Sequence, residues 1–378
     1  MSDGAPINPS MLRWARERSG YSIQDVADRL RIKPETVTNW ELGEAEITYG
    51  RVDALAAFYR RRSAVFYLTE PPEEDETLPP DFRAEQETRT PGILLLVRRA
   101  KERRDIALEL AAELNEPPMR FTFEATPHED TEDVGARLRA FLRLEEPTET
   151  WENDTHGYEA LGARKFAAET AGALVFQAPA EEIGHASGLS IYFDTCPVAV
   201  LRGSDNAKRR SFTLMHELAH LGLRSGGVCD LHDDGIELFC NRVAAATLVS
   251  ADALRREIRR RGAASSPPSK DVAHLAKVFS VSEQAMMLRL VTIGAISLDA
   301  YMARRAEFSM RTGSAQSGGS HHQVVLSRNG ERFSRIVLDA YDRGLITSHR
   351  ASTTLGTNVA SLEKIAEGLA KKSFRRAS

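Results

Sequence analysis

The stretch His216-Glu217-Leu218-Ala219-His220 decides how the rest of the chain is interpreted. On a helix, two histidines four residues apart point the same way, so both imidazoles can bind one zinc ion. The glutamate between them then faces a water at the metal and can act as its general base. Ser211 is a candidate N-cap, and the apolar surface is formed by Phe212, Met215, Leu218, Ala219 and Leu223. The pattern predicts a buried, rigid helix; the alternative is a pair of surface histidines that flank a glutamate by chance.

A third ligand is predicted at Glu237, seventeen positions after His220. It would complete a His/His/Glu set and leave one zinc position open for water, as in catalytic sites. Asn241 lies one helical turn beyond Glu237, so its side-chain oxygen could accept the free ring N–H of a ligating histidine. An ordinary exposed helix charge is the alternative for Glu237. The competing ligands in the intervening segment are Asp230, His232, Asp233 and Asp234.

Two segments around these residues resemble the core of the ImmA/IrrE metallopeptidases. They are Arg210-Ser-Phe-Thr-Leu-Met-His-Glu-Leu-Ala-His220 and Glu237-x-x-x-Asn241-Arg-Val-Ala-Ala-Ala-Thr-Leu248. In that family two histidines and a downstream glutamate bind zinc, which corresponds here to His216, His220 and Glu237. The resemblance further implies that Glu217 is the base and that the core is zincin-like with a small sheet.

The chain departs from this family's pattern at two places in the second segment. Val249-Ser250 stands where the family usually has a Met-Pro pair that closes the helix. Cys240 stands where a small residue such as alanine is usual. Neither position is a proposed ligand, so the departures concern the end of the helix more than the metal.

The N-terminus carries a second pattern, a succession of short helices. The predicted helices are Leu12–Arg16, Ser22–Leu30 and a third that runs from Pro34 to Trp40-Glu41. Ser22 with Asp25 makes a variant capping box, and Gly43 is a typical stop for the third helix. Pro34 suits the first position of a helix, where its missing N–H costs no hydrogen bond.

This region resembles the lambda-repressor-like (Xre) helix-turn-helix from about Leu12 to Leu68. The resemblance implies that Arg16 and Glu41 form a structural ion pair and are not DNA contacts. The recognition helix would enter the major groove, where Asn and Gln can bind adenine edges. The residues predicted to contact DNA are Gln24, Lys33, Glu35, Thr36, Thr38 and Asn39. A protein-interaction module is the alternative, because three small helices with a glycine turn also build such modules.

Charge limits how this region could bind DNA. Residues 1–70 contain ten Lys/Arg and ten Asp/Glu, a net charge of zero. A neutral domain lacks the broad basic face that drives nonspecific phosphate binding. DNA binding should therefore depend on local Arg and Lys placement and on dimerisation. The whole chain has a formal net charge of -4, which gives no general attraction to nucleic acid or anionic lipid.

Composition indicates the class of protein. A chain of 378 residues with 42% hydrophobic residues is long enough for two or three domains. No run approaches the roughly 18 apolar residues of a membrane span, and Met1-Ser-Asp-Gly4 has no signal-peptide character, so we expect a cytoplasmic protein. Three cysteines without a CxxC pair make a disulfide framework unexpected.

The predicted fold class is α+β and mainly helical. Its predicted parts are a five-helix helix-turn-helix domain (1–70), an acidic linker and helix (71–117), the metallopeptidase core (118–262), a helical helix-turn-helix-like subdomain (263–312) and a C-terminal helical module without an assigned role (321–378). Strands are predicted at Leu174–Gln177, Leu189–Phe193 and Val198–Leu201. One edge strand near the metal should bind an extended peptide, but the sequence does not indicate which. The basic run Arg98–Arg104 is predicted as a solvated helix face, with DNA contact as the alternative.

The patterns together predict a bacterial or phage regulatory protein that combines DNA binding with zinc endopeptidase activity. Glu217 would move the proton between water and the leaving amine. The family resemblance suggests that the substrate is a transcriptional repressor whose cleavage derepresses stress or mobile-element genes. The candidates for stabilising the oxyanion are His185, Tyr192 and His232. The alternative function is a transcription factor or antitoxin-like protein in which the metal is structural or sensory and nothing is cleaved.

Overall fold

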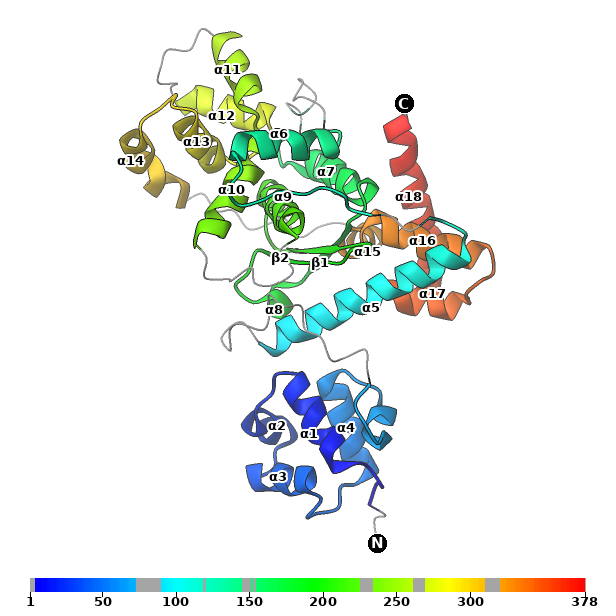
Figure 1. The fold of residues 1–378 in the computed structure, drawn as a ribbon. Coiled ribbons are helices and arrows are strands. Elements are labelled where there is room, and N and C mark those ends of the chain that lie inside the picture. Colours follow the sequence, from blue (N-terminus) through cyan, green and yellow to red (C-terminus); the bar gives the residue numbers. More distant parts are fainter. Residues whose placement is uncertain are drawn as a thin grey trace. The chain divides into compact units, whose positions relative to one another are not determined.

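We describe the protein from a computed structural model. It describes residues 4–72, 90–117, 120–144, 151, 154–224, 234–260, 269–309 and 320–377. Most of the predicted acidic linker, residues 73–81, therefore lies outside the described residues. The chain divides into two compact units, residues 1–99 and 100–378, and each is described by itself below (Figure 1).

The first unit is a bundle of short helices. Its elements are α1 (Pro9–Arg18), α2 (Ile23–Leu30), α3 (Pro34–Leu42), α4 (Tyr49–Tyr59) and the 3-10 helix η1 (Ser63–Tyr67). The three helices predicted from the sequence are thus confirmed, while the fifth helix is a single 3-10 segment. Its core is built from Leu12, Val26, Val37, Leu55 and Phe66, all buried.

Local interactions explain where these helices begin and end. The Ser22 hydroxyl accepts from the Asp25 amide at 3.1 Å, and the Asp25 carboxylate accepts from the Ser22 amide at 2.7 Å, so the predicted capping box is present. Arg31 ends α2 in the left-handed conformation, with φ 54°. Gly43 ends α3 with φ 74°, a conformation that glycine adopts without a steric penalty.

The second unit consists of a small sheet and helices. The sheet contains β1 (Leu174–Ala178), β2 (Gly188–Ile191) and β3 (Val198–Arg202) in the order β1-β3-β2. β1 runs parallel to β3, and β2 runs antiparallel to it, with Gly188 opposite Leu201. The three predicted strands are therefore confirmed within a few residues at their ends. β2 is an edge strand of this sheet.

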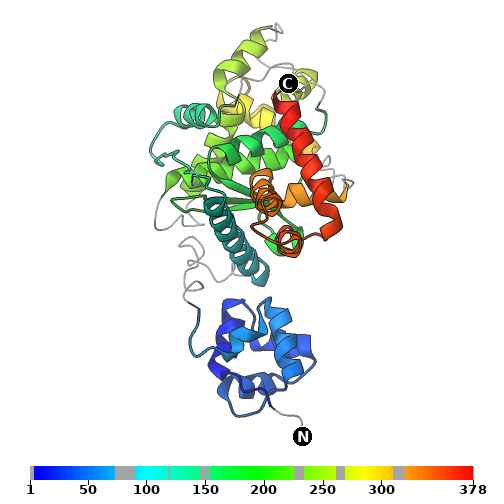
Figure 2. The same ribbon diagram turned by 90° about the vertical axis from the view of Figure 1, so that its right-hand side faces the viewer.

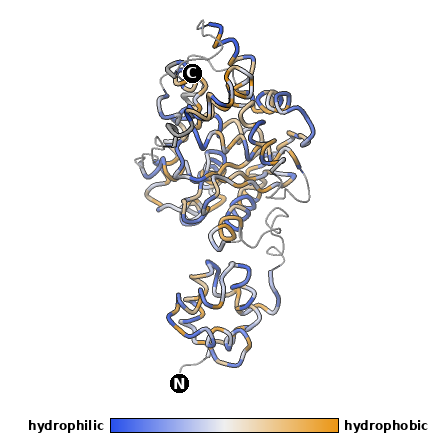
Figure 3. The backbone as a smooth tube through the Cα atoms, turned by 90° about the vertical axis from the view of Figure 1, so that its left-hand side faces the viewer, coloured by the Kyte–Doolittle hydropathy of each residue, from blue (hydrophilic) through white to orange (hydrophobic). Residues whose placement is uncertain are grey.

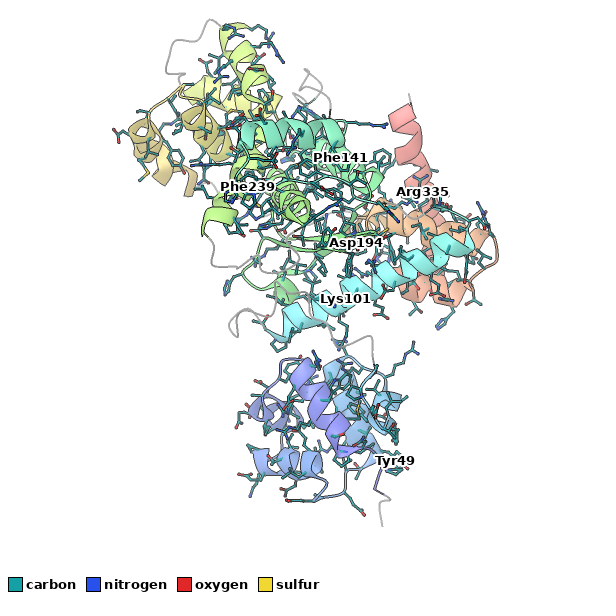
Figure 4. All side chains as sticks on the ribbon, viewed as in Figure 1. Tyr49, Lys101, Phe141, Asp194, Phe239 and Arg335 are labelled. Carbon is teal, nitrogen blue, oxygen red and sulfur yellow. The ribbon has the colours of Figure 1, made fainter. Side chains whose placement is uncertain are left out.

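The helices that accompany this sheet are α5 (Pro91–Glu113, which begins in the first unit), α6 (Thr131–Phe141), α7 (Tyr158–Thr170), α8 (Ala180–Ile183), α9 (Ala207–Leu223), α10 (Asp234–Leu248), α11 (Ala251–Arg260), α12 (Ser269–Val278), α13 (Glu283–Thr292) and α14 (Leu298–Ser309). Some of them, such as α7 and α9, pack on the sheet, and others, α11 to α14, lie away from it (Figures 1 and 2). One hydrophobic cluster extends from Phe121 to Tyr301, and it joins α6, α9, α10, α12 and α13. Figure 3 shows orange, hydrophobic segments in the interior of this unit, and Figure 4 labels Phe141 and Phe239, which belong to or pack on the cluster.

Close helix packing positions α10. A Cβ added at Gly135 of α6 would lie 2.5 Å from the Ala246 Cβ of α10, so these helices approach at a distance that only glycine allows. Despite the Val249-Ser250 departure, α10 ends at Leu248, and the Ser250 hydroxyl accepts from the Ala253 amide at the start of α11. The predicted domain boundaries are not tested by this packing and stay predictions.

The C-terminal helices pack on the sheet. They are α15 (His321–Asn329), α16 (Glu331–Asp342), α17 (Ser348–Leu355), the 3-10 helix η5 (Val359–Ser361) and α18 (Leu362–Ala377). The buried Glu169 carboxylate of α7 accepts from the amides of Glu331 and Arg332, each at 3.1 Å, and so caps α16. The rings of Phe176 and Phe333 meet edge to face at 5.6 Å between centroids. These contacts attach residues 320–377 to the sheet of the second unit.

The basic run in α5 was predicted as a solvated face, and for three of its arginines this is wrong. The Arg98 guanidinium donates to the Tyr59 carbonyl at 3.0 Å and to the Arg60 carbonyl at 2.7 Å. The Arg104 guanidinium lies 3.9 Å from the centroid of the Phe193 ring and donates to the Thr195 carbonyl at 2.9 Å. Arg103 lies over the Phe176 ring at 5.3 Å. Aromatic faces and carbonyls bind these cations because guanidinium groups are weakly hydrated. Among the helices that the structure describes, none is long and apolar enough to cross a membrane.

Candidate metal centre

The helix that carries the HExxH motif begins earlier than the sequence indicates. Asn206, and not Ser211, is its N-cap, because the Asn206 side chain accepts from the Arg209 amide at 2.9 Å. Ser211 is fully buried inside α9 and its hydroxyl caps nothing. The segment 208–210 is consequently the first turn of the helix. Arg210 is buried there and donates to the Gln177 side chain of β1 at 2.9 Å.

The three predicted ligands converge in space. His216 and His220 lie one turn apart on α9, and their Nε2 atoms are 3.0 Å apart. Glu237 lies in the first turn of α10, with Oε2 3.3 Å from His216 Nε2 and Oε1 3.1 Å from His220 Nε2. Within the described part of the chain, these three residues are the one group of His, Cys, Asp or Glu side chains that could hold a metal ion.

These distances fit a zinc ion. Two ligand atoms about 2.0–2.2 Å from a tetrahedral zinc lie roughly 3.3 Å apart, close to the separations observed. His216 Nδ1 is buried and has no hydrogen-bond partner in the part of the chain that the structure describes. Hydrogen bonds from His216 and then His220 hold the pKa of Glu237 well below its usual range. The donor set, two imidazoles and an ionised carboxylate, is one that zinc binds in catalytic sites.

Glu217 directly follows His216 on α9 and lies in a confined space. The residue is only 6% exposed, and its carboxylate makes no hydrogen bond with any residue that the structure describes. The edge strand β2 passes close to it. A Cβ added at Gly188 would lie 2.7 Å from Glu217 Oε1 and 2.5 Å from Thr213 Cγ2. The position of the carboxylate therefore depends on a glycine in the neighbouring strand.

Asn241 is on α10, one turn after Glu237, as predicted. Its side chain is exposed, and within the described residues it forms no hydrogen bond with His216, whose Nδ1 stays unpartnered. A supporting role for Asn241 therefore remains a prediction. The exposed position has a simple cause, since the buried face of α10 is formed by Phe239, Cys240, Val243 and Ala244.

The other residues considered from the sequence are only partly described. Asp230, His232 and Asp233 lie outside the described residues, as does the side chain of Asp234. Tyr192 donates to Asp194 at 3.0 Å, and burial together with that bond raises the pKa of Tyr192. His185 is exposed. No hydrogen bond or ion pair described by the structure joins Tyr192 or His185 to the three ligand residues, so neither is assigned as an oxyanion donor.

Sequence reasoning missed two contributors to this region. Gly188 gave no signal, because a glycine at the start of a strand is common and only the packing of β2 on α9 makes it necessary. The Gln177 side chain was also missed: it accepts from Arg210 and from the Ser327 hydroxyl at 3.0 Å, and so links α9 to α15. Three residues far apart in the sequence make this link, which no local pattern could reveal.

The predicted DNA-contacting residues lie around α2 and α3 in the first unit. Lys33, Glu35 and Gln24 are exposed, while Thr36, Thr38 and Asn39 are half-buried. Gln24 donates to Asp28 at 2.7 Å, and the Thr38 hydroxyl donates to the Pro34 carbonyl at 3.2 Å. Arg16 and Glu41 form the predicted ion pair, with Nε 2.7 Å and Nη2 2.9 Å from the carboxylate oxygens.

Two known protein families match this chain, one over the metal centre and one over the N-terminal helices. Residues 168–291 match the peptidase M78 family model, described as the IrrE N-terminal-like domain, and this match includes His216, Glu217, His220 and Glu237. Residues 12–66 match a family model described as helix-turn-helix. No curated protein matched the chain. The two resemblances stated from the sequence are thereby confirmed.

Proposed function

Since the chain joins a helix-turn-helix domain to an IrrE N-terminal-like domain of the peptidase M78 family, we propose that it is a bacterial or phage regulator that binds DNA and hydrolyses a protein substrate. One observation carries the proposal: the buried glutamate of the HExxH motif directly follows one of three residues, two histidines and a glutamate, whose ligand atoms converge. A structural metal site has no use for a carboxylate that bonds to none of the described residues.

In this proposal His216, His220 and Glu237 hold the metal and Glu217 handles the proton. Zinc bound there would lower the pKa of a water and polarise the scissile carbonyl. Glu217 takes a proton from the attacking water and returns it to the leaving amine nitrogen. The confined space beside β2 limits the rotation of its side chain.

The substrate segment binds along β2. This strand is an edge of the sheet, so an extended peptide can add to it through backbone hydrogen bonds. Gly188 at its start approaches Glu217, which brings an added strand close to the base. By resemblance to the ImmA/IrrE metallopeptidases, the substrate is a transcriptional repressor in a stress or mobile-element response.

DNA binding belongs to residues 1–70. The ion pair Arg16–Glu41 and the capped α2 give this domain a fixed frame, and the exposed ends of Lys33 and Glu35 lie on the recognition helix or directly before it. With no net charge, the domain should select sequence through base edges more than it binds phosphates.

Proteolysis is tested with the zinc-loaded chain and the repressor encoded by a neighbouring gene. We expect cleavage by the native chain. Glu217→Gln should reduce the rate by roughly 10²–10⁴-fold with zinc content unchanged, because an amide cannot accept the proton. Glu181→Gln, a change of an exposed glutamate on α8, is the matched control. Equal cleavage by the Glu217 variant, or none by the native chain on any such repressor, would support the alternative of a non-proteolytic regulator.

The DNA-binding part is tested by mobility shift on genomic fragments at two salt concentrations. Thr38→Ala with Asn39→Ala should weaken binding to a preferred fragment by a few kcal/mol, since a good base-edge contact contributes roughly 1–3 kcal/mol. Zinc content should not change. If no fragment is preferred at either salt concentration, residues 1–70 are better assigned to docking with another protein.

A further inference from the structure

The C-terminal helices repeat the backbone of the N-terminal helix-turn-helix. α17 (Ser348–Leu355) has the same eight-residue length as α2 (Ile23–Leu30). Each is followed by one left-handed residue, Gly356 with φ 64° and Arg31 with φ 54°. This left-handed residue produces the sharp turn between the two helices of the motif.

The same hydrogen bonds close both turns. The Thr357 amide donates to the Ser352 carbonyl at 2.9 Å, and the Ile32 amide donates to the Ala27 carbonyl at 3.0 Å. One residue earlier, the Gly356 amide donates to the Thr353 carbonyl at 3.1 Å, as Arg31 does to Asp28 at 3.3 Å. The two turns therefore agree in their hydrogen bonding as well as in their length.

The buried positions also correspond at a constant offset along the chain. Ala351, Ser352, Leu355, Leu362 and Ile365 are buried in the C-terminal pair of helices. The corresponding residues of the first unit are Val26, Ala27, Leu30, Val37 and Trp40, which are buried except for the half-buried Leu30. A small residue before the turn and two apolar residues in the second helix hold the helices together in both cases. We refer to residues 348–372 as the C-terminal corner.

A third copy of this backbone shows that the pattern alone does not make a DNA-binding surface. In α12–α13 the Val281 amide donates to the Ala276 carbonyl at 2.9 Å, and Ser280 is left-handed with φ 46°. Here the second helix is used internally. Met287 is buried, and the buried Arg289 donates to the Val249 carbonyl at 2.8 Å. This corner is part of the core of the second unit.

In the C-terminal corner the corresponding side of the second helix faces solvent. The exposed residues at its start and on its outer face are Asn358, Val359, Ala360, Glu363, Lys364 and Glu367. Val359 is 49% exposed. Figure 2 shows α18 running along the surface of the second unit. Among the described residues, nothing packs over this face as the hydrophobic core packs over α13.

Charge distinguishes the two exposed corners. The C-terminal corner, residues 348–372, contains four Lys/Arg and two Asp/Glu, a net charge of +2, whereas the corresponding residues 23–47 contain three Lys/Arg and six Asp/Glu, a net charge of -3. In α18 the exposed lysines Lys364 and Lys371 are two turns apart, and the exposed Asn358 is the N-cap residue of the 3-10 helix η5 that leads into α18. A basic helix-turn-helix with an open recognition side is suited to the phosphate backbone of duplex DNA.

We propose that the C-terminal corner is a second DNA-contacting element of this chain. Lys364 and Lys371 of α18 bind phosphates, and Asn358 to Ala360, at the start of the preceding 3-10 helix η5, lie against the groove. Two acidic residues lie on the same face, Glu363 and Glu367, and the Glu367 carboxylate is 4.0 Å from the Lys371 ammonium group in an exposed pair, which keeps the nonspecific affinity moderate. The inference goes beyond the proposed function, which assigns DNA binding to residues 1–70 alone.

The first test uses the full chain with Thr38→Ala and Asn39→Ala, so that the N-terminal domain contributes little. Binding to a random-sequence duplex is measured over a range of salt concentrations. Adding Lys364→Ala and Lys371→Ala should weaken binding roughly tenfold at 0.1 M salt and reduce the slope of log K against log salt by about 1.8. Lys277→Ala, at an exposed lysine of the α12–α13 corner, is the matched control and should change neither.

The second test does not depend on charge. A photocrosslinking amino acid replaces Ala360 of the C-terminal corner or, as control, the exposed Leu288 of α13. We expect crosslinks to duplex DNA from position 360 only. Unchanged affinity and slope in the lysine variant, equal crosslinking from both positions, or crosslinking of position 360 to protein alone would each overturn the proposal, the last by assigning this face to a partner protein.

Discussion

The ion pair Arg16–Glu41 and the metal centre on α9 and α10 are both polar clusters that join two helices, yet they are built differently. Arg16 donates to both oxygens of Glu41 and to the Tyr21 carbonyl at 3.0 Å, so its donors are used within the domain. In the metal centre, His216 Nδ1 has no hydrogen-bond partner among the described residues, and Glu217 bonds to none of them either. We call the first cluster saturated, because its polar groups bond to one another, and the second open, because some of its polar groups bond to no described residue.

The difference indicates which cluster serves the fold and which serves chemistry. A buried ion pair whose hydrogen-bonding groups are all used holds two helices in a fixed relative position. Removing one partner leaves the other as a buried charge without a partner. In an open cluster, polar groups are buried without hydrogen-bond partners, which lowers the stability of the fold. Proteins keep such groups where they bind a ligand or take part in a reaction. Substitutions that act on one cluster at a time can test this interpretation.

The largest effect is expected when the open cluster loses a ligand. Glu237→Ala removes one of three donors, so zinc affinity should fall by more than the roughly 10–100-fold that loss of an outer supporting residue causes. Thermal unfolding of the first unit should not change. Metal content after dialysis against a weak chelator measures the effect, with Asp230→Ala and His232→Ala as comparisons. Normal zinc in the Glu237 variant would refute the ligand assignment and remove the open cluster from the comparison.

A smaller effect, confined to stability, is expected when the saturated pair is broken. Arg16→Ala leaves Glu41 with a side chain only 6% exposed and without its cation. Removing one partner of a buried pair costs roughly 3–5 kcal/mol, so the first unit should lose a large part of its free energy of unfolding while zinc content stays the same.

Arg13→Ala is the matched control for Arg16→Ala. Arg13 sits one turn earlier on α1 and pairs with Glu17, and both of these side chains are more than half exposed. An exposed pair of this spacing contributes about 0.3–0.5 kcal/mol. Equal shifts in the unfolding midpoint for the two variants would contradict the view that Arg16–Glu41 is the structural pair.

The sequence predicted the parts of this molecule that depend on local spacing. The four-residue interval between His216 and His220, the capping box of Ser22 and the left-handed stop at Gly43 are each specified by neighbours in the chain. The position of Glu237 was predicted from the chemistry of zinc and a family pattern, and the structure brings its carboxylate within 3.3 Å of both histidines. Its role as a ligand stays a prediction until metal is measured.

What could not be predicted depends on distant contacts. The cap of α9 was placed at Ser211, although Asn206 begins the helix one turn earlier, because both residue types are good caps and only packing selects one. The attachment of α16 by Glu169 joins residues more than 150 positions apart. The open face of the C-terminal corner follows from what packs on α18 and is equally invisible in the sequence. Tertiary burial, and not propensity, decides these features.

The smallest effect should come from changing the space around Glu217 without removing any polar group. In Gly188→Ala the new methyl group would need the room that Glu217 Oε1 and Thr213 Cγ2 now occupy, so the carboxylate must shift. A displacement of about 1 Å at a base can cost up to roughly 10²-fold in rate, and we expect about tenfold slower cleavage with zinc content unchanged.

Gly162→Ala is the matched control, because a Cβ on this α7 glycine meets nothing within 4 Å. It should leave the rate unchanged and stabilise α7 by roughly 0.5–1 kcal/mol. If the Gly188→Ala variant cleaves the substrate at the native rate, the position of the Glu217 carboxylate does not depend on β2. The contrast between the two clusters would then depend only on the three ligand residues.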